Sequence, residues 1–367
     1  MEVVRFVNEK MRFGEPFGRR LAWALLVVAA LAAPVIADVP PPFLDDVEEA
    51  FSRIEVRGEQ MTAAVNGIIP TPWYRTSLRN WFGFRNHFQG IQRVPGSDYL
   101  VMSGSNIHEP MGNLFVIKMN GASTAVVASV SVDAVLWHAG GLGMDGPILA
   151  VPIFGDSPLR SKVVFYDMSR PEEPRRLSVE IERPGEKAYA VGLTRLENGR
   201  LLAAVLADRD GTPRRIDFYL SQSDDLADGF LPEAVRWFTS HVQARDGQDS
   251  NFGDFQSVNF VRQADGRLYL VGFHNTVPSM PFIPGRDYAD LYEVILPDET
   301  AKADSPSLAR PSLVKTASLQ MYCKDGYCNM DAAAGLHVDP ATRTLEVYAA
   351  PGWVHDDRIK FTAYRQQ

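Results

Sequence analysis

The sequence is short of several features that would assign it to a class at once. Among 367 residues there are only two cysteines, no basic cluster beyond the N-terminal region, and no long apolar run after residue 37. With a net charge of −8, the missing basic cluster argues against a nucleic-acid partner. The missing apolar run argues against a membrane span once the N-terminal segment is removed. The hydrophobic share of 46% is ample for a large core.

Familiar catalytic motifs are also missing. The chain has no G-x-S-x-G element, no P-loop and no dinucleotide fingerprint, which argues against the common serine-hydrolase and nucleotide-binding motifs. It has no His-x-His and no His-Glu-x-x-His pattern that would identify a metal site. The acidic stretch from Asp246 to Asp254 lacks the closing glutamate of a calcium loop, so we interpret it as a polar turn.

The first 37 residues have the layout of an export signal. Basic residues precede an apolar run from Leu21, which ends in the small-x-small sequence Val35-Ile36-Ala37. We expect residues 1–37 to be a signal peptide, cleaved after Ala37, and the protein to be periplasmic or secreted. The alternative is an uncleaved anchor, although the run is short for a membrane span. Residues 38–84 would then form an N-terminal extension before the repeats.

The two cysteines lie close together, at Cys323 and Cys328. In an exported chain such a pair is most simply a disulfide that closes a small loop. A metal site is the alternative, but no further ligand lies at short spacing.

The rest of the chain repeats one pattern. An apolar strand, a tight turn rich in Asp, Asn, Gly or Pro, and a second apolar strand recur five times, which predicts β-hairpins. The reference positions of the five copies lie 51, 51, 67 and 76 residues apart, at Gly90, Gly141, Gly192, Asn259 and Gly335. Their glycines would let inner strands approach closely, which is a structural role.

Two more strands follow each hairpin. The third strands are predicted at 113–118, 162–167, 215–220, 290–295 and 358–364, and the more polar fourth strands at 124–132, 176–181, 234–239 and 312–317. Repeated four-stranded units predict an all-β, five-bladed β-propeller over residues 85–367. A β-sandwich is the alternative, but it does not explain the repetition. The fifth unit lacks a fourth strand, so we expect the N-terminal extension to close the ring, with Ser52–Arg57 as the best candidate.

A site is predicted where the inner strands begin, because the ends of the second strands return to the same mouth of the central channel. Four of the seven histidines belong to this zone. The positions just before the reference residues and after the second strands supply the candidate ligand-binding residues, which are His87, His138, Tyr189, Gln256, Asp331, Asn86, Trp137 and His274.

The chemistry of this zone allows two interpretations. His87 and His138 could be the first ligands of a divalent metal ion, completed by Asp331, His108, Glu109 or His274, and such an ion could activate water. Alternatively, the histidines only bond backbone groups at a crowded channel mouth. Aromatic residues between Trp73 and Phe84, with Trp353, would either pack the extension onto the ring or form a shelf for a sugar.

Two stretches, Phe260–Thr276 and Asp331–Ala349, are similar to exported bacterial proteins known only as uncharacterised. The whole mature chain resembles five-bladed β-propellers, several families of which are glycoside hydrolases acting on arabinans, xylans or fructans. Those enzymes need carboxylates that converge on the channel. Here the corresponding inner positions hold His87, His138, Tyr189, Gln256 and Ala332, and the nearby carboxylates are those of Asp331 and Asp254.

These observations leave three functional classes. The first is a binding module that takes a saccharide or another small polar ligand at the channel mouth. The second is a hydrolase that uses a metal or a histidine as general base. The third is a scaffold that offers its surface to a protein partner. Whether there is turnover, a bound metal or an oligomer is left open by the sequence.

Overall fold

The structure is a computed structural model that describes residues 43–69, 87–106, 111–156, 159–208, 214–276, 285–297, 309–324, 327–352 and 358–367. The predicted signal peptide and several residues named above lie outside these ranges. They are Asn86, His108, Glu109, Trp353 and the aromatic segment from Trp73 to Phe84.

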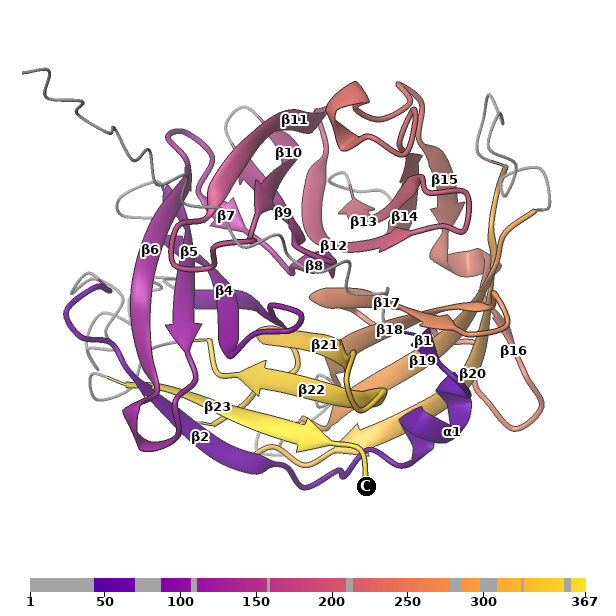
Figure 1. Ribbon diagram of the computed structural model, residues 1–367. Coiled ribbons are helices and arrows are strands. Elements are labelled where there is room, and N and C mark those ends of the chain that lie inside the picture. The colour runs from indigo at the N-terminus through magenta and orange to yellow at the C-terminus, as the bar shows by residue number, and fades with distance from the viewer. Residues whose placement is uncertain are drawn as a thin grey trace, which may run out of the picture. The chain divides into compact units, whose positions relative to one another are not determined.

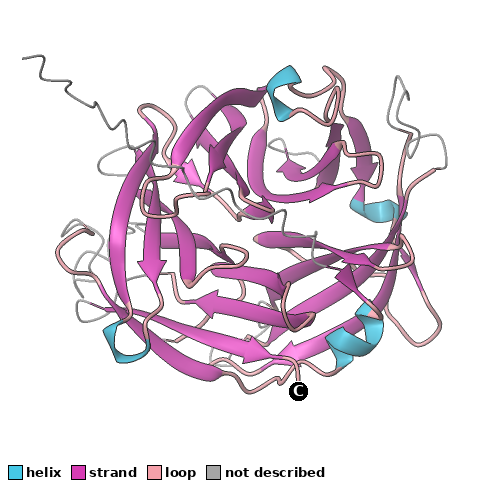
Figure 2. Cartoon of the chain, in the orientation of Figure 1, coloured by secondary structure: helices cyan, strands magenta, loops and turns pink. Residues whose placement is uncertain are grey.

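The described chain is all-β and propeller-like (Figures 1 and 2). Strand pairing gives three sheets and one closed arrangement of eight strands. Single parallel pairs, Ala64 with Ala125 and Ala334 with Gly90, join two four-stranded halves of the closed arrangement, so we describe the chain as five mainly antiparallel sheets. The first contains β3 (His87–Arg93), β4 (Tyr99–Asn106), β5 (Met111–Lys118) and β6 (Ala125–Asp133). The second contains β7 (His138–Ala139), β8 (Gly143–Asp145), β9 (Ile148–Asp156), β10 (Leu159–Asp167) and β11 (Arg175–Pro184). The third contains β12 (Lys187–Arg195), β13 (Leu201–Asp208), β14 (Arg215–Leu220) and β15 (Val235–Phe238).

The fourth and fifth sheets use segments from other parts of the chain. The fourth contains β17 (Ser257–Gln263), β18 (Leu268–Asn275), β19 (Asp287–Ile295) and β20 (Ser312–Met321), with the short strands β1 (Phe43–Leu44) and β16 (Gln243–Ala244) at its edges. The fifth contains β21 (Ala333–Asp339), β22 (Thr344–Ala350), β23 (Arg358–Arg365) and β2 (Glu59–Ala64). Short helical segments connect strands: α1 (Val47–Ser52), η2 (Gly121–Ser123), η3 (Leu226–Asp228) and η4 (Thr239–His241).

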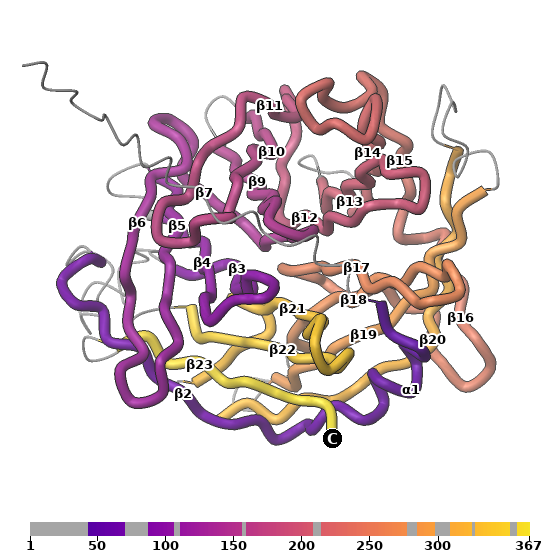
Figure 3. The backbone as a smooth tube through the Cα atoms, viewed as in Figure 1, coloured from indigo at the N-terminus to yellow at the C-terminus, as the bar shows by residue number. Residues whose placement is uncertain are grey.

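The N-terminal strand is not the segment that the sequence suggested. β2 pairs antiparallel with β23, from Glu59 opposite Ala363 to Ala64 opposite Arg358, and Figure 3 shows these two segments side by side. The predicted strand Ser52–Arg57 is wrong, because its first residue ends helix α1 and only Ile54 forms an isolated bridge, to Gln366. The helix forms because Asp46 caps it, accepting a hydrogen bond from the Glu49 backbone N–H.

The turns inside the hairpins explain part of the repeated pattern. Glycines at Gly96, Gly146, Gly199 and Gly266 have positive φ, a backbone conformation that costs glycine little. In the fifth hairpin Arg343 takes the positive-φ position, with φ of 53°, and the side chain of Asp339 accepts backbone hydrogen bonds from Ala341 and Thr342 to hold this turn. The tight turns therefore follow from local sequence.

The hydrophobic core lies between neighbouring sheets. Each of five clusters of buried side chains lies between two sheets: the first and second, the second and third, the third and fourth, the fourth and fifth, and the fifth and first. Representative pairs are Val116 with Val151, Val163 with Val205, Phe218 with Leu270, Val271 with Val347, and Phe115 with Phe361. This alternation of sheets and apolar layers is not the two-layer packing of a sandwich.

The inner strands meet closely around the axis. A Cβ atom at Gly141 would overlap the Gln256 carbonyl, and one at Gly335 would overlap the Ile91 carbonyl. Asn259, which replaces the glycine in the fourth repeat, instead reaches across the axis. Its Nδ2 donates to Gln92 Oε1 and to the Leu142 carbonyl, each at 3.2 Å, and its Oδ1 accepts from the Leu336 backbone N–H at 3.0 Å. Buried hydrogen bonds thus tie four inner strands together.

Candidate functional site

The strand register brings the predicted site residues to one end of the sheets. The first residues of the inner strands lie opposite the last residues of the second strands, as in the pairs His87–Ser105, His138–Phe154, Ser257–Phe273 and Ala333–Ala350. We call this end the mouth. The Phe88 backbone N–H donates to the Gly352 carbonyl at 2.9 Å, which connects the first and fifth sheets there.

One side of the mouth is a row of rings, which we call the aromatic half: His87, Trp137, His138, Phe154 and Tyr189. The ring centroids of His87 and His138 are 5.1 Å apart in an edge-to-face arrangement. His138 stacks on Phe154 at 4.2 Å, and Phe154 meets Tyr189 at 5.3 Å. Phe154 is buried, whereas the other four side chains are partly exposed. The row therefore offers a partly exposed aromatic surface built by the first three sheets.

Two cations adjoin this row. The Lys187 ammonium lies 5.8 Å from the centroid of the Phe154 ring, and the Arg214 guanidinium lies 5.7 Å from that of Tyr189. Both distances are within the range of cation–π attraction. Arg214 also forms an ion pair with Asp254, which precedes the inner strand of the fourth sheet. Arg214 therefore links the aromatic row to the polar side of the mouth.

The other side, which we call the carboxylate half, comprises His274, Asp287, Asp290 and Asp331 from the fourth and fifth sheets. His274 Nε2 lies 3.2 Å from Asp290 Oδ2, so this nitrogen donates to the carboxylate. Asp290 also accepts from Ser318 Oγ at 2.6 Å and forms an ion pair with Lys315 at 3.1 Å. His274 stacks on Tyr288 at 5.5 Å, which fixes its ring plane.

The three carboxyl groups have different proton affinities. Burial raises the pKa of Asp287, although the Met330 N–H and the Asn275 amide donate to it and counteract part of that effect. Burial would also raise the pKa of Asp290, but the hydrogen bonds from His274 and Ser318 and the charge of Lys315 outweigh it and lower this pKa.

Asp331 is solvent-exposed, but surrounding protein atoms desolvate it and raise its pKa. Arg214 and His274 oppose this rise, and Asp287 adds to it. These interactions place Asp331 within the electrostatic reach of both halves of the mouth.

The predicted residues are brought together unevenly. His87, Trp137, His138 and Tyr189 form the aromatic half, and His274 and Asp331 belong to the other half. Gln256 is partly exposed at the start of the fourth inner strand, and its backbone N–H donates to the Phe273 carbonyl. Asn86 lies outside the described residues.

The metal hypothesis gains no support from the described part of the chain. No three His, Cys, Asp or Glu side chains converge there as an ion would require. His87 and His138 lie close together, but neither Asp331 nor His274 joins them in such a group. His108 and Glu109, the other proposed ligands, lie outside the described residues.

Several residues of the site were not predicted. Phe154 was missed because it lies inside β9, where the repeat predicts an apolar strand residue and gives no sign of a site. Asp287 and Asp290 were missed because they belong to a strand, where the only indication of a site is that a residue is charged. A fully buried aspartate in an apolar strand implies a specific partner, and Lys315, 4% exposed in its side chain, is that partner.

The predicted disulfide is confirmed. Cys323 and Cys328 are bonded, with their Cα atoms 5.3 Å apart, and both sulfur atoms contact the Tyr364 hydroxyl. The loop that they close ends three residues before Asp331. Separately, none of the helices described is long and apolar enough to cross a membrane.

Comparisons with known proteins find no matching family model and no matching curated protein. Solved structures show a distant structural similarity to five-bladed propeller enzymes, as the sequence predicted. An α-L-arabinanase from Penicillium chrysogenum, complexed with arabinobiose, has 12% identity and a TM-score of 0.46, covering 84% of this chain and 98% of that one. A GH43_1 enzyme from Xanthomonas citri has 9% identity and a TM-score of 0.43, covering 77% and 88%. A mannose phosphorylase from Leishmania mexicana has 10% identity and a TM-score of 0.40, covering 86% and 92%.

Proposed function

We propose that this protein binds a saccharide at the mouth of its β-propeller, between the aromatic half and the carboxylate half. The observation that carries the proposal is the partly exposed row of rings from His87 to Tyr189. Arg214 adjoins this row at Tyr189, and its charge acts on the exposed carboxyl group of Asp331. An aromatic surface beside polar and charged groups matches the chemistry of a sugar.

A pyranose or furanose ring has an apolar C–H face and a periphery of hydroxyl groups. The C–H face can lie on Tyr189 and on the two histidines, where it gains contact area without burying a polar group. The hydroxyl groups can donate to Asp331 and accept from Lys187 or Arg214. Sites for small ligands commonly combine an aromatic wall with a few polar groups in this way.

We further propose that β2 completes a ring of five blades. The pairing of β2 with β23 supports this reading, because it supplies the fourth strand that the last repeat lacks. A variant from which the residues between Ile54 and Val65 are deleted lacks β2. It is expected to lose cooperative unfolding, because the edge of β23 would be left unpaired. Circular dichroism during urea unfolding would report this, and an unchanged transition would contradict the ring.

Export is the expected setting for this function. The basic and apolar N-terminal segment and the Cys323–Cys328 disulfide both support a periplasmic or secreted protein. N-terminal sequencing of the protein recovered from outside the cytoplasm is expected to start at Asp38. A start at an earlier residue would indicate an uncleaved anchor.

Saccharide binding can be tested on an array of neutral and acidic oligosaccharides. The native protein is expected to bind a restricted set, and Tyr189→Ala and His138→Ala are expected to lose it while keeping the melting temperature within a few degrees. Tyr99→Ala is the matched control, because Tyr99 is a partly exposed tyrosine at the start of β4, at the end of the first sheet opposite the mouth. Loss of binding in the control as well, or binding by all variants alike, would reject the mouth as the site.

The same oligosaccharides separate binding from turnover. Release of reducing ends would show a hydrolase, and its disappearance in His138→Ala or Asp331→Asn would locate the chemistry at the mouth. Binding without release would show a lectin-like module. If no saccharide binds, another small polar ligand or a scaffold role remains, and a scaffold should tolerate all of these substitutions.

A further inference from the structure

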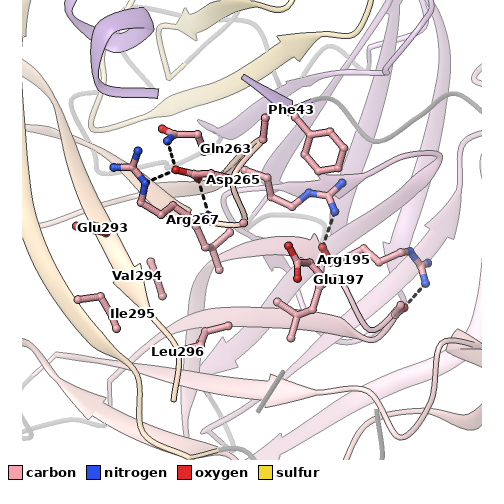
Figure 4. Close-up of a pocket in the computed structure, with 16 residues that line it drawn as sticks. Phe43, Arg195, Glu197, Gln263, Asp265, Arg267, Glu293, Val294, Ile295 and Leu296 are labelled. Carbon is pink, nitrogen blue, oxygen red and sulfur yellow. Dashed lines mark hydrogen bonds and ion pairs between the residues drawn. The ribbon is translucent and has the colours of Figure 1, made fainter. Parts of the chain in front are cut away.

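A large cavity lies at the opposite end of the third and fourth sheets from the mouth. Its volume is about 740 Å³, within the range of pockets that hold small molecules. The turns that close the third and fourth hairpins form its walls, and Phe43 of β1 and the end of β19 complete them. Figure 4 shows Arg195 and Glu197 on one side and Val294, Ile295 and Leu296 on the other.

Among the described residues that line the cavity, Arg262 is the arginine that forms no ion pair with a carboxylate. Arg262 is partly buried, and its Nη1 donates to the Arg195 carbonyl at 2.8 Å. Its guanidinium lies 4.7 Å from the centroid of the Phe43 ring. Burial lowers the pKa of Arg262, and the charges of the Asp145 and Glu197 carboxylates offset only part of this effect.

The neighbouring arginines of the cavity are already paired. Arg267 Nε donates to Asp265 Oδ2 at 2.8 Å, and its Nη1 donates to the Tyr269 hydroxyl at 3.1 Å. Arg195 donates to the Asp224 carbonyl at 3.0 Å and has Asp145 as a partner at 3.5 Å. Arg262 is therefore the cation of this cavity with unused donors, and an Arg fork matches a carboxylate in a two-point contact.

The remaining wall is apolar. Leu196 and Leu268 come from the two hairpin turns, and Val294, Ile295 and Leu296 come from the end of β19. Ile295 is 49% exposed, although most large apolar side chains of the described chain are buried. A ligand body resting on this wall would remove apolar surface from water.

We propose that this cavity is a second binding site, for a small organic acid whose carboxylate contacts Arg262 and whose apolar body lies on the wall formed by β19. The site is separate from the mouth and does not depend on saccharide binding. Three carboxylates also line the cavity. Asp265 and Glu293 are paired with Arg267 and Arg245, and the charge of the exposed Glu197 is one that a carboxylate ligand must avoid.

The test uses butyrate, hexanoate and octanoate in calorimetric titrations of the full mature chain. Octanoate is expected to bind at one site, with affinity rising up to about fourfold for each added methylene. Octyltrimethylammonium, which has the same tail and the opposite charge, is expected to bind at least about tenfold more weakly because it lacks the contact with Arg262.

Variants separate the contact from a general charge effect. Arg262→Met is expected to weaken octanoate binding by about tenfold or more, whereas Arg262→Lys keeps the charge and loses less. Arg267→Met is the matched control, since it removes a paired cation of the same cavity and is expected to change affinity by less than about threefold. Glu197→Gln is expected to strengthen binding about twofold, through relief of repulsion.

The outcome is decisive in each direction. Absence of saturable octanoate binding to a folded protein, or equal losses in Arg262→Met and Arg267→Met, would overturn the proposal. Tyr189→Ala, at the mouth, is expected to leave octanoate binding unchanged. A failure of the saccharide experiments and a failure of this one are therefore distinguishable.

Discussion

The two halves of the mouth are built on different principles. The aromatic half is a row of rings in mutual contact, and its partly exposed members can give up solvent contact without leaving a charge unpaired. The carboxylate half contains Asp290, which is almost fully buried, in contact with the equally buried Lys315. In the proposed site one half would serve only contact with the ligand, whereas the other half is also part of what holds the fourth sheet together.

The difference matters for how substitutions are interpreted. Removing a ring at the surface changes the area available to a ligand, but removing Asp290 leaves a buried cation behind. The cost of an unpaired buried charge is larger than that of a lost surface contact. Loss of binding after a change in the carboxylate half must therefore be corrected for loss of folding.

The largest expected effect is on stability. Asp290→Asn should lower the free energy of unfolding by about 3 kcal/mol, because Lys315 keeps only the pairing with the exposed Asp249. Urea unfolding at neutral pH measures this. Tyr189→Leu, the comparison in the aromatic half, should cost less than about 1 kcal/mol. Equal costs would contradict the division between the halves.

The next effect is on affinity. Once an oligosaccharide ligand is in hand, Tyr189→Ala should weaken its binding by about tenfold, the usual scale for losing an aromatic contact at a binding surface. Asp331→Asn should cost less, about threefold, because an amide still accepts one hydrogen bond from a hydroxyl group. Titration calorimetry gives both values. A larger loss for Asp331→Asn would place the main recognition in the carboxylate half.

A smaller effect is expected on the pH dependence of ligand affinity, which should differ between variants of the two halves. The carboxylate of Asp331 accepts hydrogen bonds from the ligand, so its contribution is complete above its folded pKa and is lost as the pH falls through it. Because this pKa is raised, the loss begins at a higher pH than for an ordinary aspartate. Asp331→Asn should remove this pH dependence of affinity, and Tyr189→Ala should retain it. Persistence of the dependence in Asp331→Asn would assign it to another group.

Asp290 and Asp287 should contribute opposite pH dependences to the stability of the fold. Asp290 has a lowered pKa, so its contribution is present above the pKa of the unfolded chain and is lost as the pH falls through the folded value. Asp287 has a raised pKa, so its ionised form destabilises the fold near neutral pH, and protonation relieves this. Asp287→Asn should therefore stabilise the protein at pH 7, with a gain that shrinks on acidification. Thermal unfolding across pH 4 to 8 measures both trends.

Much of the architecture could be predicted from local sequence. The hairpin turns need Gly or a turn-stabilising Asp, and the third strands are apolar and β-branched, so their positions agree with β5, β10, β14, β19 and β23. The closing segment could not be chosen correctly, because Ser52–Arg57 alternates as a strand would, while the Asp46 cap favours a helix through Ser52. Short segments of this kind are decided by tertiary packing.

The candidate site was predictable in part for a similar reason. His87, His138 and Tyr189 share a position three residues before the reference residue of their repeat, and Asp331 lies four residues before its own, so the repeat itself aligned them at the mouth. Phe154 and Asp290 reach the site from a second and a third strand, where the repeat predicts burial but no partner, and Arg214 lies just before a third strand. Their roles depend on contacts between sheets, such as Arg214 with Asp254 and Asp290 with Lys315.

The most direct test of saccharide binding at the mouth is nitrogen-detected NMR of the histidine side chains during titration with an oligosaccharide. The account predicts that the imidazole signals of His87 and His138 shift together and saturate at one affinity. The signal of His337, beside a small cavity at the other end of the axis, should stay unchanged. Saturation with shifts only at His337, or with none at His87 and His138, would contradict the proposed site.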